Sequence, residues 1–179
     1  MKRGDKLYLC KDKNEIPLTL NSYEDLFSGF DPRDYSKKAI SKDFLSECKN
    51  AAEDKIGEIK LSLFLPRSKR DSAKENEIKN RLKEHFLKHF LEKKKELFNI
   101  RAIGAIWFAT GCILTAITAI FMEFETSLSM RALINIAHPA GWFFLWEGLA
   151  KILIHSKEKK EDYAFNKKLK NSKISFLNS

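Results

Sequence analysis

The sequence predicts an α+β fold in two parts. A cytosolic head, residues 1–99, forms a small sheet packed by two helices, and a two-helix transmembrane hairpin follows over 100–156. Residues 1–99 carry 23 basic and 18 acidic side chains, whereas 100–156 carry three of each. Within the second part, 102–122 and 133–155 are apolar stretches long enough to cross the hydrocarbon core as helices. The remaining residues, 157–179, carry seven lysines and are expected to form a basic cytosolic tail.

Three short segments predict the strands of the head. Lys6–Cys10 and Ile16–Leu20 are apolar-rich runs on either side of a polar link, a pattern typical of a hairpin. Glu58–Leu65 alternates apolar and polar residues, and Pro66 follows it, so we predict a strand that ends there. A head of this size can bury one modest core, and we therefore expect a single small domain.

Two helices are predicted to pack on this sheet. Ser41 is a suitable N-cap for a helix over Lys42–Lys55. A longer juxtamembrane helix over 71–99 begins at Asp71 or Ser72 and has apolar residues every fourth position: Ile78, Leu82, Phe86 and Phe90. No glycine or proline interrupts the chain from there to Gly104, so this helix is expected to continue into the first span.

The two spans differ in how well they suit a membrane. Residues 102–122 contain no charged side chain. Residues 133–155 contain Glu147, and a carboxylate at the centre of a helix costs about 2.5 kcal/mol or more on the insertion scale. We therefore expect the second span to insert packed against the first. An alternative places 131–137 in the outer interface and starts the span near Pro139.

Charge asymmetry predicts the orientation. Basic residues flank the apolar region on both sides, while the link Glu123–Met130 contains two glutamates and no lysine or arginine. By the positive-inside rule, both termini face the cytoplasm and the protein is a multi-pass protein of the inner (plasma) membrane. The apolar run near the N-terminus is too short for the core of a signal peptide. The three cysteines, Cys10, Cys48 and Cys112, form no CxxC motif, which fits a reducing compartment.

Small residues indicate how the spans pack. Gly104 and Gly111 are seven residues apart, and so are Gly141 and Gly148. Such stripes let helix backbones approach closely, although glycine is also common in membrane helices without any packing role.

Glu147 is the foremost candidate for chemistry, because an ionisable residue in a span indicates function by default. Lys151 lies one turn later and can pair with it while reaching toward the cytoplasmic face. The alternatives are a structural ion pair and a proton or ion pathway. Asn135 and His138 are further polar candidates in the same span, with His138 on the opposite side of the helix from Glu147.

The remaining candidates lie outside the spans. Six lysines flank the membrane and are expected to contact anionic lipid: Lys93, Lys94, Lys95, Lys157, Lys159 and Lys160. His85, His89 and Glu92 share one helix side and form a weak candidate metal site, with packing as the alternative. We expect no cofactor, and no nucleic-acid partner because no recognition motif accompanies the basic residues.

The order of motifs resembles an uncharacterised group of small prokaryotic two-span membrane proteins with a cytosolic N-terminal domain. The matching stretches are DPRDYSKKAISKDFL, IKLSLFLP with the following helix that ends in KEHFLKHF, and GWFFLWEGL. The resemblance covers most of the chain and implies this architecture, without an assigned activity.

Three functions therefore remain open. The first is a non-catalytic, membrane-anchored interaction or regulatory module that binds an unknown protein partner. The second is an oligomeric membrane effector or channel-like protein that uses Glu147, with a defence role as one example. The third is an enzyme with its site in the head, although no motif in the sequence indicates one.

Overall fold

The computed structural model describes residues 14–124 and 127–178, which form two compact units. The first unit comprises the residues up to Leu91 together with those from Ala164 onward. The second unit is Glu92–Tyr163.

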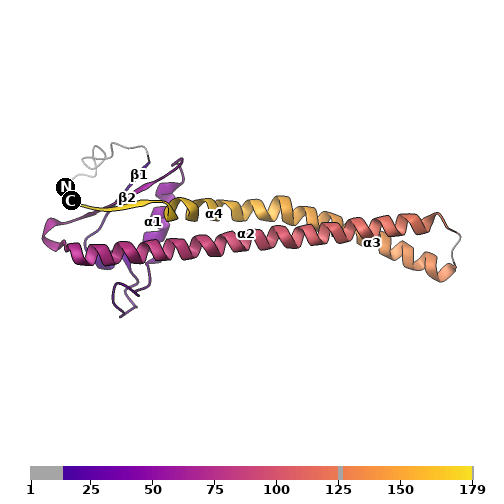
Figure 1. Ribbon diagram of the computed structural model, residues 1–179, viewed down its shortest axis with the longest axis horizontal. Helices are drawn as coiled ribbons and strands as arrows, with labels where there is room; N and C mark the ends of the chain where they lie inside the picture. Colours follow the sequence, from indigo (N-terminus) through magenta and orange to yellow (C-terminus); the bar gives the residue numbers. More distant parts are fainter. Residues whose placement is uncertain (1–13, 125–126, 179) are drawn as a thin grey trace. The chain divides into compact units, whose positions relative to one another are not determined.

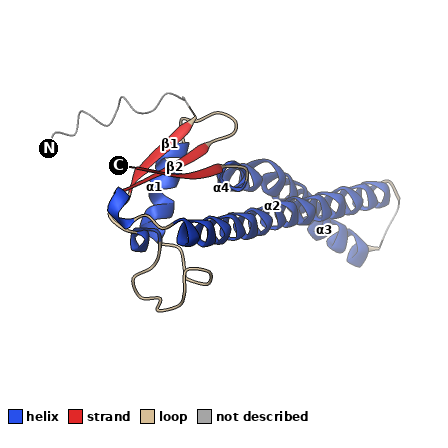
Figure 2. Ribbon diagram, turned by 60° about the vertical axis from the view of Figure 1, so that its left-hand side comes forward, coloured by secondary structure: helices blue, strands red, loops and turns tan. Residues whose placement is uncertain are grey.

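The first unit contains a three-stranded parallel sheet in the order β1 (Glu15–Thr19), β2 (Lys60–Leu65) and β3 (Lys173–Asn178) (Figure 2). The predicted strand that ends before Pro66 is confirmed as β2. The expected hairpin is not: Lys6–Cys10 lies outside the described residues, and β1 pairs in parallel with β2. Alternation alone carries no information on strand direction, which here depends on the α1 crossover between β1 and β2.

The third strand comes from the segment that we expected to be a basic tail. In the register, Leu61 lies opposite Ile174 and Leu63 lies opposite Phe176. Lys173–Leu177 was not expected to join the head, because the sequence separates it from β2 by more than 100 residues and periodicity does not report such long-range pairing. The two ends of the described chain therefore belong to one sheet.

Two predicted helices complete the core of the first unit. The helix α1 (Lys42–Ala52) begins after Ser41, whose hydroxyl accepts a hydrogen bond from the backbone N–H of Asp43. This confirms the predicted N-cap. The core combines residues of the sheet, α1, the first half of α2 and α4, among them Leu63, Phe44, Cys48, Ile78, Leu82, Phe86 and Leu169.

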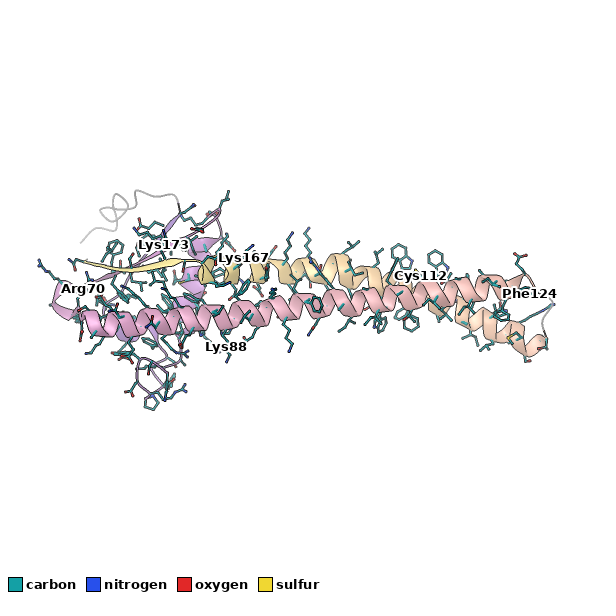
Figure 3. All side chains as sticks on the ribbon, in the orientation of Figure 1. Arg70, Lys88, Cys112, Phe124, Lys167 and Lys173 are labelled. Carbon is teal, nitrogen blue, oxygen red and sulfur yellow. The ribbon has the colours of Figure 1, made fainter. Side chains whose placement is uncertain are left out.

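The longest element is α2 (Ser72–Met122), a continuous helix of 51 residues (Figure 1). The predicted continuation of the head helix into the first apolar stretch is therefore confirmed. Among the described residues, α2 alone is long and apolar enough to cross a membrane, and only 11% of its most apolar stretch is buried. Figure 3 shows side chains of the apolar part of α2, with the exposed Cys112 among them, standing out from the ribbon.

The chain returns through three consecutive helical segments. These are α3 (Leu128–Ala150), a π-helical turn (Lys151–His155) and α4 (Ser156–Lys170). Asn135 and other polar residues interrupt the apolar sequence of α3, which also contains Pro139, and its hydropathy does not reach that of the apolar stretch of α2. Among the described residues, one helix could therefore span a membrane by its length and composition, and a two-helix transmembrane hairpin is not shown.

A lysine of α4 caps the end of α1. The Lys168 ammonium donates hydrogen bonds to the carbonyl oxygens of Ala52 (3.0 Å) and Lys55 (2.6 Å). Ala52 is the last residue of α1 and Lys55 lies in the turn after it, so the ammonium lies at the C-terminus of the helix, where a cation is favoured.

We expect Lys168→Met to lower the free energy of unfolding of the head by about 1.5 kcal/mol, because it removes charge-assisted hydrogen bonds. Urea unfolding followed by hydrogen exchange of the β2 amides measures this change. The exposed neighbour Lys167 gives the matched control. An equal loss in Lys167→Met would mean that the lost charge, and not the cap, causes the effect.

Candidate functional site

In the second unit, α2 and α3 approach backbone to backbone at glycines. All four glycines that the sequence singled out lie at this contact: Gly104, Gly111, Gly141 and Gly148. A Cβ added at Gly148 would collide with the backbone nitrogen of Phe108 and would lie 2.8 Å from the carbonyl oxygen of Gly104. Backbone atoms cannot rotate away, so these helices would have to separate to admit a side chain.

The distance from an added Cβ to its nearest neighbouring atom differs among the other three glycines. A Cβ at Gly111 would lie 2.5 Å from the backbone nitrogen of Leu145. At Gly141 the nearest atom is the Thr115 hydroxyl, also at 2.5 Å, which belongs to a side chain that is able to rotate. At Gly104 the nearest atom is a side-chain carbon of Ile152 at 2.9 Å. The contact is therefore tightest at Gly111 and Gly148.

His138 joins α3 to the far end of α2. Its Nδ1 lies 2.9 Å from the hydroxyl oxygen of Thr118, which is itself buried and lies 3.0 Å from the carbonyl oxygen of Leu114. The hydroxyl can therefore donate to the carbonyl while it accepts from the imidazole. Asn135 is exposed on α3 and does not belong to the contact between His138 and Thr118.

Glu147 and Lys151 form an ion pair one helical turn apart on the return helix. The Lys151 ammonium also lies 5.0 Å from the centre of the Trp107 ring, a cation–π arrangement. Neither the pairing distance nor the partner Trp107 follows from sequence spacing, because Trp107 belongs to the other helix.

The register of the two helices locates this pair. Because Gly148 lies against Gly104 and Phe108, its neighbour Glu147 stands within about 10 Å, measured along α2, of Arg101. Arg101 is the last charged residue before the apolar stretch. Glu147 therefore lies beside the beginning of the α2 stretch 102–122 and not beside its centre.

The six lysines expected to contact lipid are found in two environments. Lys93 and Lys159 both pair with Glu96, at 2.8 Å and 3.0 Å. These contacts tie α4 to α2 inside the second unit. The others are exposed: Lys94, Lys95, Lys157 and Lys160.

The histidines of α2 lie close together. The ring centres of His85 and His89 are 4.3 Å apart. Burial, with a smaller contribution from His89, lowers the pKa of His85 to about 4, so His85 is neutral at physiological pH. Glu92 lies further along α2, and within the described residues no group of three such side chains is placed to hold a metal ion.

Sequence analysis did not predict a polar cluster of the head that is centred on Glu75. Arg70 donates two hydrogen bonds to the Glu75 carboxylate, at 2.7 Å and 3.0 Å, and a third to Asn178 at the end of β3. Tyr23 also donates to Glu75, at 3.3 Å, and accepts from the backbone of Asp71. The Glu75 carboxylate is thus fully engaged in holding the start of α2 to β3.

Comparisons with known proteins give no identification. No protein-family model matches the chain, and neither the curated proteins nor the solved structures contain a significant match.

Proposed function

We propose that this protein is a membrane-anchored interaction module whose head lies in the cytoplasm and whose α2 and α3 form a two-span anchor in the inner membrane. The observation that carries the proposal is the parallel pairing of β2 with β3. These strands lie before and after the whole apolar region, and the head core contains residues from both sides.

Connectivity then constrains the topology. Since β2 and β3 belong to one sheet, the chain before α2 and the chain after α4 lie on the same side of any membrane. If the apolar half of α2 crosses, the chain has to cross back before α4, and only α3 is available. The tight glycine contact supports this pairing, because it lets the less apolar α3 share the interior with α2.

The distribution of apolar and basic side chains supports the same orientation. Large apolar side chains are exposed along the second unit, including Ile106, Ile113, Ile117, Phe143 and Leu153. A soluble protein rarely leaves so many exposed together. Lysines cluster at the end of this region that leads to the head, the side that the positive-inside rule assigns to the cytoplasm.

An exposed aromatic side chain of the head supports an interaction role. Phe30 is fully exposed at the tip of a loop that is closed by a bridge between Phe27 and Ile40. Asp31 stiffens this loop by accepting hydrogen bonds from Arg33 and from the backbone of Ala39 (2.7 Å). An exposed aromatic side chain on a preorganised loop is typical of an anchor in a protein interface.

Cysteine accessibility in sealed vesicles tests the topology. In a variant without the native cysteines, we expect Ser127→Cys to react with a membrane-impermeant maleimide only from outside. Ser68→Cys and Asn171→Cys should react only from the cytoplasmic side. Reaction of all three positions from the same side would overturn the two-span anchor.

A second experiment tests the interaction role. A photo-crosslinking amino acid at Phe30, in cells, should give an adduct of one defined mass that persists in Glu147→Gln. The same amino acid at the exposed Lys49 serves as the control position. Equal adducts from both positions, or loss of the adduct in Glu147→Gln, would contradict the assignment of Phe30 as the anchor.

One observation favours the oligomeric effector as a second candidate. Asn135, Trp142 and Trp146 are exposed along one stripe of α3, with exposed fractions of 50% and 63% for the two tryptophans. Outward polar and aromatic residues in a span suit helix–helix association.

Oligomeric mass in lipid discs discriminates this candidate. The effector predicts a defined oligomer that shifts toward monomer in Trp142→Ala. If wild type and Trp142→Ala are both monomers, the effector is contradicted and the membrane-anchored interaction module remains. Glu147→Gln should leave the mass unchanged in either case, because Glu147 is paired with Lys151 inside one chain.

A further inference from the structure

The second unit contains a groove of about 270 Å³ where the π-helical turn meets α2. Two apolar side chains from α2, Ile100 and Ile103, line one wall. The opposite wall carries four ionisable side chains of the return helix: Lys151, His155, Glu158 and Lys159. π-Helical turns are rare and often mark functional sites, because the extra residue redirects side chains.

Hydrogen-bond donors outnumber acceptors in this groove. Lys151 and Lys159 each use one N–H on a carboxylate, Glu147 and Glu96 respectively, and retain two more. His155 is exposed and adds an imidazole to the lining. Glu158 supplies the one carboxylate of the lining. The lining itself carries two ammonium groups against one carboxylate, and the unused N–H donors suit a ligand with several acceptor oxygens.

The apolar wall narrows the ligand class. Ile103 is half exposed and belongs to the charge-free stretch, whereas Arg101 and the lysines after Ser156 mark its charged border. A ligand here would place an anionic group among the cations and an apolar group against the isoleucines. This border position rests on the proposed membrane anchor.

We propose that the groove binds one anionic phospholipid. Its phosphate accepts hydrogen bonds from Lys151, His155 and Lys159, and the first carbons of its acyl chain pack on Ile103. Glu147 and Glu96 position the two lysines, so the cations are ordered before the lipid arrives. The carboxylate of Glu147 therefore acts on a lipid through Lys151, which gives this intramembrane residue a role without a conducting pathway.

Native mass spectrometry of the full chain, released from discs with equal phosphatidylglycerol and phosphatidylcholine, tests the proposal. We expect wild type to retain one phosphatidylglycerol preferentially. Loss of the Lys159 cation should reduce the preference about fivefold, the factor for the ~1 kcal/mol that one lysine or arginine contributes at a membrane surface. His155→Ala with Lys159→Gln also removes a hydrogen-bond donor and should therefore lower the preference by more than fivefold.

The control removes the same charge outside the groove. Lys160 is an exposed residue beside Lys159 and does not line the groove, so Lys160→Gln should leave the preference within twofold of wild type. Ile103→Trp, which fills the groove and keeps every charge, should reduce retention as the double variant does. Equal loss in Lys160→Gln, or no loss in Ile103→Trp, would overturn the site.

Two further arms separate the alternatives. Millimolar inorganic phosphate should not displace the lipid; displacement to the level of the double variant would make the ligand a soluble anion and refute the lipid assignment. Flotation of the wild type with liposomes tests the anchor separately. A protein that floats but shows no lipid preference refutes the groove alone, and one that does not float refutes the proposed function.

Discussion

Alanine at Gly148 is expected to destabilise the second unit by about 2 kcal/mol, although alanine is the better helix former. Helix propensity alone would give a gain of ~1 kcal/mol over glycine. The new Cβ, however, would meet the backbone of Phe108 and the carbonyl of Gly104, so the helices must separate and lose contacts along their length. In the pair Gly111→Ala with Gly148→Ala we expect about 4 kcal/mol.

Tryptophan fluorescence during denaturation in micelles measures this effect, because all three tryptophans belong to the second unit: Trp107, Trp142 and Trp146. Ala109→Leu is the matched control, since Ala109 is exposed on the same helix. It adds more volume than alanine does and should change the stability by less than ~0.5 kcal/mol. A stabilised Gly148→Ala protein would mean that the helices do not approach at this position.

Methionine at Arg70 is expected to cost the head about 3 kcal/mol, the second large effect. The Glu75 side chain is only 6% exposed and would keep a single donor, Tyr23, for its charge. An unpaired buried carboxylate is strongly unfavourable. The substitution also removes the link to Asn178, so β3 should lose protection in hydrogen exchange before β1 does.

The same pair predicts how the head responds to acid. The hydrogen bonds from Arg70 lower the pKa of Glu75 below its ordinary 4.5. A lowered pKa in the folded state stabilises the fold above the unfolded pKa, and that stability is lost as the pH falls through the folded value. Wild type should therefore weaken below about pH 4.5, and Arg70→Met should weaken less steeply over the same range.

Arg67→Met is the control for both measurements, since Arg67 is an exposed residue of the turn before Arg70. It changes the net charge equally and should leave the stability and its acid branch unaltered. A steep acid branch that persists in Arg70→Met would assign the loss of stability to another carboxylate.

Local signals predicted the elements of the head. Ser41 identified the start of α1, the alternation before Pro66 identified β2, and the four-residue apolar spacing identified α2 as far as its continuation into the apolar stretch. Each of these signals involves residues within one or two turns or strands. Periodicity placed the apolar residues of β2 and of the first part of α2 in the core, as the structure has them, but the polar Ser62 of β2 is also buried.

The long-range contacts could not be predicted in this way. The pairing of β3 with β2, the cap of α1 by Lys168 and the link from Arg70 to Asn178 all join residues more than 100 positions apart. For the candidate site, sequence spacing suggested the pair of Glu147 and Lys151. It contained no information on the register of α3 against α2, which places Glu147 beside the beginning of the α2 stretch 102–122.

The late position of β3 in the chain has a consequence for biosynthesis. On the proposed topology, β2 leaves the ribosome early, whereas β3 follows only after both apolar stretches have been translated. Until then β2 is an open edge, and the core lacks Phe176. We expect completion of the sheet to depend on correct insertion, so that a chain stalled in the membrane step displays an unfinished head to chaperones and proteases.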